Sequence, residues 1–141
     1  MEYEWARLRA DELCKYAQDD TVVILPVAAL EQHGPHLPVM VDSRLAEEVS
    51  KRTASLGRAK GIPIITLPVV WHGLSEHHMP FGGTVTLTSN TFFLIVRDLI
   101  KSISRHGFSK FLILNGHGGN ITAAEDLSLI HISEPTRQFA I

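Results

Sequence analysis

Residues 29–42, ALEQHGPHLPVMVD, place several side chains that can bind metal ions directly after an apolar stretch. In an extended chain, alternate side chains point to the same side, so Glu31 and His33 can face one point while Gln32 faces away. A Gly-Pro turn follows, and Asp42 comes soon after it. Carboxylates combined with imidazoles suit Zn²⁺, Mn²⁺ or Fe²⁺, so this spacing predicts a metal site rather than a soft thiolate site.

Two residues of this stretch also have simpler explanations. Asp42 can serve as the N-cap of a helix that we expect to begin at Asp42 or Ser43. His36 is expected to be a structural or supporting histidine rather than a ligand. The sequence alone leaves the choice for Asp42 open.

His117 lies in a second motif, NGHGGN (115–120), which follows an apolar stretch. Glycines on both sides of the histidine let the backbone approach a ligand closely. A phosphate-binding loop is the competing interpretation, but GHGG lacks the Lys-Ser/Thr ending of a P-loop and the spacing of a dinucleotide-binding motif. His117 is therefore a further candidate metal ligand.

A third polar stretch, WHGLSEHHMPFGGT (71–84), concentrates groups that can move protons or contact a substrate. These groups are His72, Ser75, Glu76, His77 and His78. No spacing within the stretch defines a metal site by itself. We expect it to contact the substrate or to support the ligands, with a polar surface loop as the alternative.

The elements that must position these groups alternate along the chain. Apolar periodicity and end signals predict helices over residues 4–18, 42–55 and 88–107, strands over 21–30, 61–73 and 108–120, and the start of another helix at 121–126. This order predicts an α/β fold with a mostly parallel sheet. Ligands bind at the carboxyl ends of such strands, where all three polar stretches lie, so we expect them to converge on one crevice.

The composition excludes several classes of protein. The chain has 141 residues, which suits one domain, and 45% of them are hydrophobic. Its formal net charge of -2 argues against general affinity for nucleic acid. Its single cysteine, Cys14, excludes an internal disulfide and suits a reducing compartment. The sequence has no apolar run of about 20 residues and no signal peptide at its start, so we expect a cytoplasmic protein with no membrane partner.

The last fifteen residues, 127–141, read LSLIHISEPTRQFAI and resemble a translated sequencing adapter. We therefore expect residues 1–126 to be the N-terminal part of a single α/β domain that is truncated at its C-terminus. Residues 127–141 are then a non-native tail. On this interpretation, His131 and Glu134 are not ligands.

The motifs PVAALEQHGPHLPVMVD, HHMPFGGT and NGHGGN together resemble those of the creatininase (creatinine amidohydrolase) family. The resemblance covers roughly residues 20–122. It implies a three-layer α/β/α fold and two divalent metal ions, Zn²⁺ and/or Mn²⁺ with Fe²⁺ as a further option. It also implies hydrolysis of an amide C–N bond, often in a ring, and a homo-oligomer at full length.

The resemblance implies a role for each matching residue. Glu31 and His117 would bind one metal ion, His33 would bind the other, and Asp42 would bridge the two. A water molecule activated by the metal ions would attack the amide carbonyl. Glu76 or His78 would deliver a proton to the leaving nitrogen, and the sequence does not choose between them.

The motifs depart from the family pattern at a few positions. Creatininase has a metal-binding glutamate two residues after this histidine, where this chain has Gly119, and relatives with NGHGGN take that carboxylate from further downstream. Gly82 replaces a proline, and Ala28 and Ala29 replace a Gly-Ser pair. The Gly119 difference weakens creatinine as the specific substrate. Creatinine, a formamidopyrimidine and a mycofactocin-type peptide all stay open within the family. A non-catalytic metal- or ligand-binding module remains the alternative outside the enzymes.

Overall fold

Four parallel strands form one sheet in the order β2–β1–β3–β4. The strands are β1 (Val22–Val27), β2 (Ile64–Thr66), β3 (Lys110–Asn115) and β4 (Phe139–Ala140). The central strand β1 places Val22 opposite Ile64 on one side and Lys110 on the other. The computed structural model describes residues 2–125 and 139–140.

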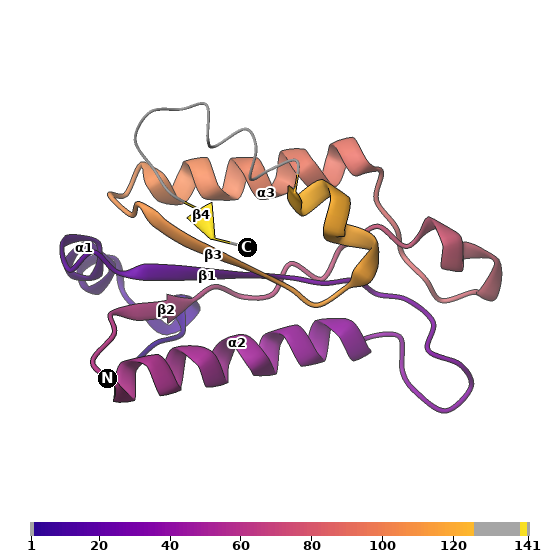
Figure 1. Ribbon diagram of the computed structural model, residues 1–141, viewed down its shortest axis with the longest axis horizontal. Helices are drawn as coiled ribbons and strands as arrows, with labels where there is room; N and C mark the ends of the chain where they lie inside the picture. Colours follow the sequence, from indigo (N-terminus) through magenta and orange to yellow (C-terminus); the bar gives the residue numbers. More distant parts are fainter. Residues whose placement is uncertain (1, 126–138, 141) are drawn as a thin grey trace.

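Two long helices cover the two faces of this sheet. α2 (Val41–Ala59) runs below the sheet and α3 (Ser89–Ser104) above it in the view of Figure 1. α1 (Ala10–Gln18) and the 3-10 turn η1 (Trp5–Arg7) lie at the amino ends of the strands. The arrangement is the three-layer α/β/α fold with a parallel sheet that we predicted.

The burial of β1 explains why its sequence is apolar at nearly every position. Val23 and Leu25 pack into a core with Phe92 of α3, whereas Ile24 packs with Ala54 of α2 on the opposite face. A strand that is buried on both faces needs a continuous apolar run rather than alternation. Both faces of β1 meet this requirement, since helices cover the sheet on each side (Figure 1).

Most predicted elements are a few residues shorter in the structure, and two differ from the prediction more clearly. The helix expected over residues 4–18 is divided into η1 and α1. The strand expected over 61–73 pairs regularly only in β2, and beyond it the chain makes isolated bridges, such as Val70 with Val27. Pro68 has no N–H to donate to a neighbouring strand, which explains why regular pairing ends there.

The segments that follow the strands carry the polar motifs. Two 3-10 turns, η2 (Glu76–Phe81) and η3 (Gly118–Asn120), lie with the β1–α2 loop at the carboxyl ends of the strands, on the right of Figure 1. Residues 121–125 are helical. The prediction of a non-native tail over 127–141 falls almost entirely outside the described residues.

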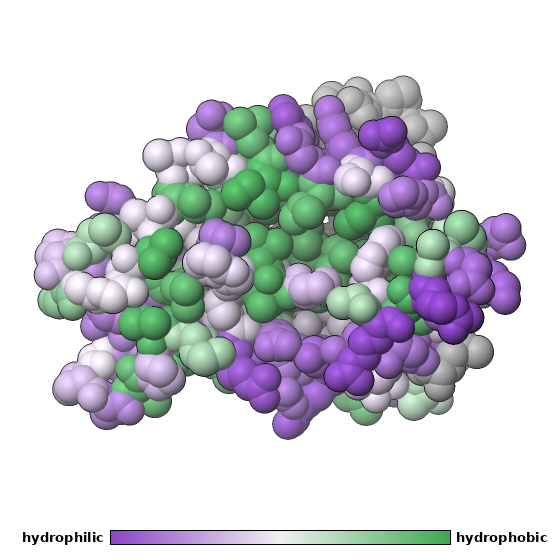
Figure 2. Space-filling view, turned by 180° about the vertical axis from the view of Figure 1, so that it is seen from behind, coloured by the Kyte–Doolittle hydropathy of each residue, from purple (hydrophilic) through white to green (hydrophobic). Residues whose placement is uncertain are grey.

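The surface of the molecule is mixed. Seen from behind, apolar side chains gather in the middle of the molecule, and polar ones dominate its upper and lower borders (Figure 2). Among the described residues, no helix is both long and apolar enough to span a bilayer.

Candidate metal centre

His117 occupies the middle of the site, at the start of the loop that follows β3. Only 6% of its surface is exposed. The Asn115 side chain makes two hydrogen bonds to the backbone of His117. Its Nδ2 donates to the His117 carbonyl at 2.8 Å, and its Oδ1 accepts from the His117 N–H at 3.1 Å. Asn120 ties the end of the loop to the Ala28 carbonyl and to the Leu74 N–H. Both asparagines of NGHGGN therefore fix the loop that carries the histidine.

Asp42 lies between two histidines. Its Oδ1 is 3.2 Å from His33 Nε2, and its Oδ2 is 2.8 Å from His117 Nδ1. α2 begins at Val41, so Asp42 lies within the first helical turn and makes no capping hydrogen bond. The N-cap explanation of Asp42 is therefore wrong, and its carboxylate is directed at the two imidazoles.

Glu31 reaches His117 from the other side. It is 7% exposed, and its Oε1 lies 3.4 Å from His117 Nδ1. Its Oε2 accepts a hydrogen bond from Ser75 Oγ at 2.9 Å and lies 3.6 Å from His78 Nε2. Glu31, Asp42 and His117 form a group whose ligand atoms lie within 4.8 Å of one another.

In a neutral His117, the hydrogen bonds decide which ring nitrogen carries the proton. Nε2 lies 3.1 Å from the Leu74 carbonyl, which can only accept, so Nε2–H donates to it. Nδ1 then carries no proton, and its lone pair faces Asp42 and Glu31. A lone pair repels carboxylates unless a cation lies between them, and therefore this donor set fits a divalent metal ion.

His33 follows the same rule. Its Nδ1 lies 3.0 Å from the backbone carbonyl of Glu31, so Nδ1–H donates and Nε2 is the lone pair that faces Asp42. An imidazole whose second nitrogen donates to a carbonyl is the usual arrangement of a metal ligand. Glu31 and His33 thus both face the group around Asp42 and His117, as predicted. Their partners differ, because His33 faces Asp42 whereas Glu31 faces His117.

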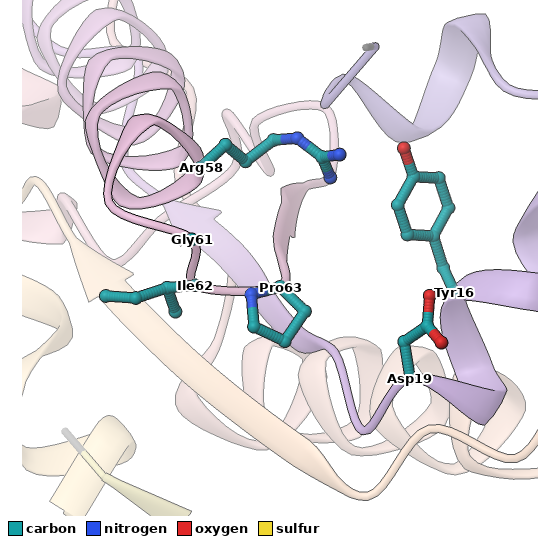
Figure 3. A pocket seen from close by; sticks show the side chains of 6 residues that line it. All are labelled: Tyr16, Asp19, Arg58, Gly61, Ile62 and Pro63. Atoms are coloured by element: carbon teal, nitrogen blue, oxygen red, sulfur yellow. The ribbon is translucent and has the colours of Figure 1, made fainter.

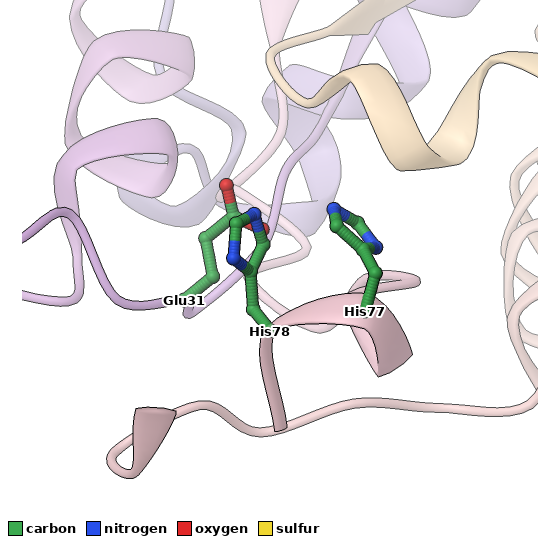
Figure 4. Close-up of side chains that lie close together, drawn as sticks. All are labelled: Glu31, His77 and His78. Atoms are coloured by element: carbon green, nitrogen blue, oxygen red, sulfur yellow. The ribbon is translucent and has the colours of Figure 1, made fainter. Parts of the chain in front are cut away.

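A second group shares Glu31. Glu31, His77 and His78 bring their ligand atoms within 4.8 Å of one another. Figure 4 shows both histidines rising side by side from η2, with the His78 ring next to the Glu31 carboxylate. The sequence singled out these histidines, but the turn that aims them at Glu31 was not predicted.

The other sequence candidates have different surroundings. Glu76 and His36 are exposed, and neither belongs to a group that could hold a metal ion among the described residues. His72 stacks on Trp71, with ring centroids 3.5 Å apart. Ser75 is fully buried, and besides its bond to Glu31 its Oγ lies 3.2 Å from His117 Nε2.

Gly119 is closely surrounded in this chain. A Cβ atom at this position would collide with the Leu74 carbonyl and would lie 2.5 Å from His117 Nε2. The Leu74 carbonyl therefore occupies the space that any side chain at this position would need. No sequence pattern could have revealed this contact between two distant loops.

A small pocket lies at the opposite end of the sheet. It has a volume of about 190 Å³ and lies where the segments before β1 and β2 meet (Figure 3). The Arg58 guanidinium lies over the Tyr16 ring, 5.1 Å from its centroid. Because this pocket faces the amino ends of the strands, it plays no part in the metal centre.

The comparisons with known proteins match this chain to one family. The family described as creatininase, creatinine amidohydrolase, matches residues 6–134. The creatinine amidohydrolase of Pseudomonas putida is 34% identical over 123 residues, which cover 82% of this chain and 45% of that protein. The mycofactocin precursor peptide peptidase of Mycolicibacterium smegmatis is 35% identical over 103 residues, covering 72% and 41%.

The fold matches solved creatininase structures. A creatininase mutant complexed with creatine superimposes with a TM-score of 0.75 and 27% identity, over 99% of this chain and 58% of that chain. A Zn-Zn form of a creatininase mutant gives the same TM-score with 28% identity, over 97% and 57%. This chain thus spans less than half of the two relatives above and a little over half of the solved structures.

Proposed function

Because this chain belongs to the creatininase family, we propose that the whole protein hydrolyses the C–N bond of a small, cyclic amide at a divalent metal centre. The observation that carries the proposal is the state of His117. Its Nε2–H is committed to a carbonyl, while its Nδ1 lone pair lies 2.8 Å from Asp42 and 3.4 Å from Glu31. A cation between the three side chains would turn this repulsion into attraction.

We propose two ions, Zn²⁺ and/or Mn²⁺. Glu31, Asp42 and His117 would hold the first. His33 would hold the second, with Asp42 bridging because its two oxygens face different histidines. When bound, such ions polarise a carbonyl group and lower the pKa of a water molecule. A solved creatininase mutant that is 28% identical to this chain is described as a Zn-Zn type. This description of a relative supports the choice of zinc.

His78 is the better of the two candidate proton carriers. Its Nε2 lies 3.6 Å from Glu31 Oε2, whereas Glu76 is exposed and outside the cluster. We therefore assign to His78, rather than to Glu76, the contact that supports protonation of the leaving nitrogen. Glu31 is held in place meanwhile by the hydrogen bond that Ser75 donates to the same oxygen.

The substrate is proposed only as a class. Relatives are named for a peptide precursor, for creatinine and for a formylaminopyrimidine, and one is named as a hydrolase of 3-dehydro-scyllo-inosose, which is not an amide. Most of these names therefore favour amides without selecting one. A cytoplasmic location and a homo-oligomeric whole protein are further proposals, which rest on composition and on the family resemblance. Sedimentation velocity of the whole protein tests the oligomer.

The deciding experiment measures bound metal and hydrolysis together. We expect the whole protein to bind divalent ions and to hydrolyse members of a panel of cyclic amides. Asp42→Ala should lose both properties, whereas His106→Ala, which removes an exposed histidine elsewhere, should keep both. A protein that binds no divalent ion under metal-replete conditions would contradict the proposal and favour a non-catalytic binding module.

A further inference from the structure

The Gln32 side chain links the loop after β1 to η2. Its amide nitrogen Nε2 lies 2.9 Å from His78 Nδ1, and its oxygen Oε1 accepts a hydrogen bond from the Gly34 N–H at 3.0 Å. Its backbone N–H donates to Thr84 Oγ1 at 3.1 Å. Gln32 therefore faces away from the metal ligands, as the alternation of the strand predicts, but it contacts the proposed proton carrier.

These contacts leave only one orientation for the amide. The Gly34 N–H can only donate, so it must face the amide oxygen of Gln32. The NH₂ group of Gln32 then faces His78 Nδ1, which must accept as a lone pair. In a neutral imidazole the proton is consequently on Nε2, the nitrogen nearest to Glu31.

His78 thus differs from His33 and His117, which present lone pairs to carboxylates. Its N–H and the Ser75 hydroxyl both supply protons to the side of Glu31 Oε2. Oε1, the oxygen nearest to His117 Nδ1, remains available to a metal ion. One carboxylate therefore separates a metal-binding side from a proton-donating side.

We propose that Gln32 is a positioning residue that fixes the tautomer of His78. It thereby makes the group of Glu31, His77 and His78 a proton-donating cluster instead of a further metal site. Without this control, the ligand atoms of the three residues are close enough to hold an ion. The assignment rests on the proposed function and deepens it, because a neutral His78 can donate a hydrogen bond from Nε2 to Glu31 or to a bound substrate only if that nitrogen keeps its proton.

The tautomer can be read directly from the imidazole ¹⁵N chemical shifts of His78 in the 141-residue chain. We expect the wild-type chain to show a protonated Nε2 and an unprotonated Nδ1. In Gln32→Glu, the carboxylate can still accept from Gly34 but cannot donate, so Nδ1 should gain a proton. Gln18→Glu, which adds the same charge at an exposed site on α1, should leave the His78 shifts unchanged.

Zinc titration supplies a second readout. A Nδ1–H that donates to the introduced carboxylate frees the Nε2 lone pair, so Gln32→Glu should bind one Zn²⁺ more per chain than the wild type. Adding His77→Ala to this variant should abolish the gain. Gln18→Glu should bind the same amount as the wild type.

The outcomes separate this inference from the proposed function. A wild-type His78 with a protonated Nδ1, or an unchanged tautomer in Gln32→Glu, would overturn the role of Gln32 even if the chain binds metal at Asp42 and His117. A whole protein that binds no divalent ion would instead contradict the proposed function, while the ¹⁵N shifts would still decide the tautomer.

Discussion

At the scale of single residues, the three histidines around the carboxylates are distinguished by what their second nitrogen contacts. His33 and His117 donate to backbone carbonyls, so each presents a lone pair to Asp42. His78 accepts from an amide and presents an N–H to Glu31. Three identical side chains thus acquire two chemical roles from their hydrogen-bond partners.

The first prediction follows from these roles. His117→Ala should lose the first ion, which Glu31 and Asp42 hold together with it, so the metal content of the whole protein should fall by about half. His33→Ala should lose only the second ion, and a metal-replete wild type should carry about twice the content of this variant. Elemental analysis of the purified variants tests this, and equal metal content in wild type and His117→Ala would refute the ligand assignment.

The second prediction concerns the crowded loop. Gly119→Ala places a Cβ against the Leu74 carbonyl, so we expect a loss of about 1–3 kcal/mol in the free energy of unfolding. Gly118→Ala is the matched control, because nothing lies within 4 Å of its added Cβ. Urea denaturation measures both, and equal stability of the two variants would contradict the crowding.

The sequence identified the candidate metal ligands but not the residues that orient them. It pointed to Glu31, His33, Asp42 and His117, which the structure brings together, although their role as ligands stays a prediction. It could not assign a contact to Gln32 or to the Leu74 carbonyl. Both act through partners more than 40 residues away, at distances that only the folded loops define.

At the scale of elements, helices and strands were predictable because the apolar periodicity is strong. α3 was recognisable from its polar start and apolar stripe, and β1 from its unbroken apolar run. β2 was overestimated because the chain after it stays apolar but makes only isolated bridges. η2 was not predicted, since a 3-10 turn has no apolar periodicity of its own.

The third prediction concerns the start of α3. Thr88 is its N-cap, and its Oγ1 accepts a hydrogen bond from the Thr91 N–H at 3.3 Å. Thr88→Ala should lower the free energy of unfolding by about 1 kcal/mol, because this donor loses its partner. Thr88→Ser keeps the hydroxyl and should remain within a few tenths of a kcal/mol of the wild type in the same denaturation experiment.

The fourth prediction concerns the contact of α2 with the N-terminal segment. Lys51 lies 2.8 Å from Glu47 and 3.1 Å from Glu4. The hydrogen bond from Lys51 lowers the pKa of Glu47 below its ordinary value of 4.5. The contribution of this contact to stability is therefore present above that value and is lost as the pH falls through the lowered pKa.

Lys51→Met should consequently reduce the free energy of unfolding by less than about 1 kcal/mol at pH 7, because the groups are partly exposed. The difference from the wild type should shrink as the pH falls below 4.5 and Glu47 becomes protonated. Lys101→Met, which removes an exposed lysine from α3, is the control. A difference that stays constant down to about pH 3 would contradict the assignment.

At the scale of the whole molecule, the site depends on the complete order of the sheet. Glu31 follows β1, Ser75 lies beyond β2 and His117 follows β3, so all three strands must be in register before the ligands meet. The sequence predicted this convergence from the topology of parallel sheets. It could not predict which oxygen meets which nitrogen, because this depends on loop geometry.

The fifth prediction is that metal ions stabilise the fold. If free Zn²⁺ is about 100-fold above its dissociation constant, it should add about 2.7 kcal/mol to the free energy of unfolding and raise Tm by roughly 10 °C. Asp42→Ala should show no such increase in a calorimetric scan. An equal increase in both proteins would place the bound ions elsewhere.

The close pair of Asp42 and His117 joins residues 75 positions apart in the chain. An ion held by both would act as a reversible cross-link within these 141 residues, whose single cysteine can form no internal disulfide. A covalent link that closes a loop of this length removes on the order of 4 kcal/mol of chain entropy from the unfolded state. The concentration of free metal would then set how long the chain resists proteolysis, so a chelator would act on its lifetime as well as on its chemistry.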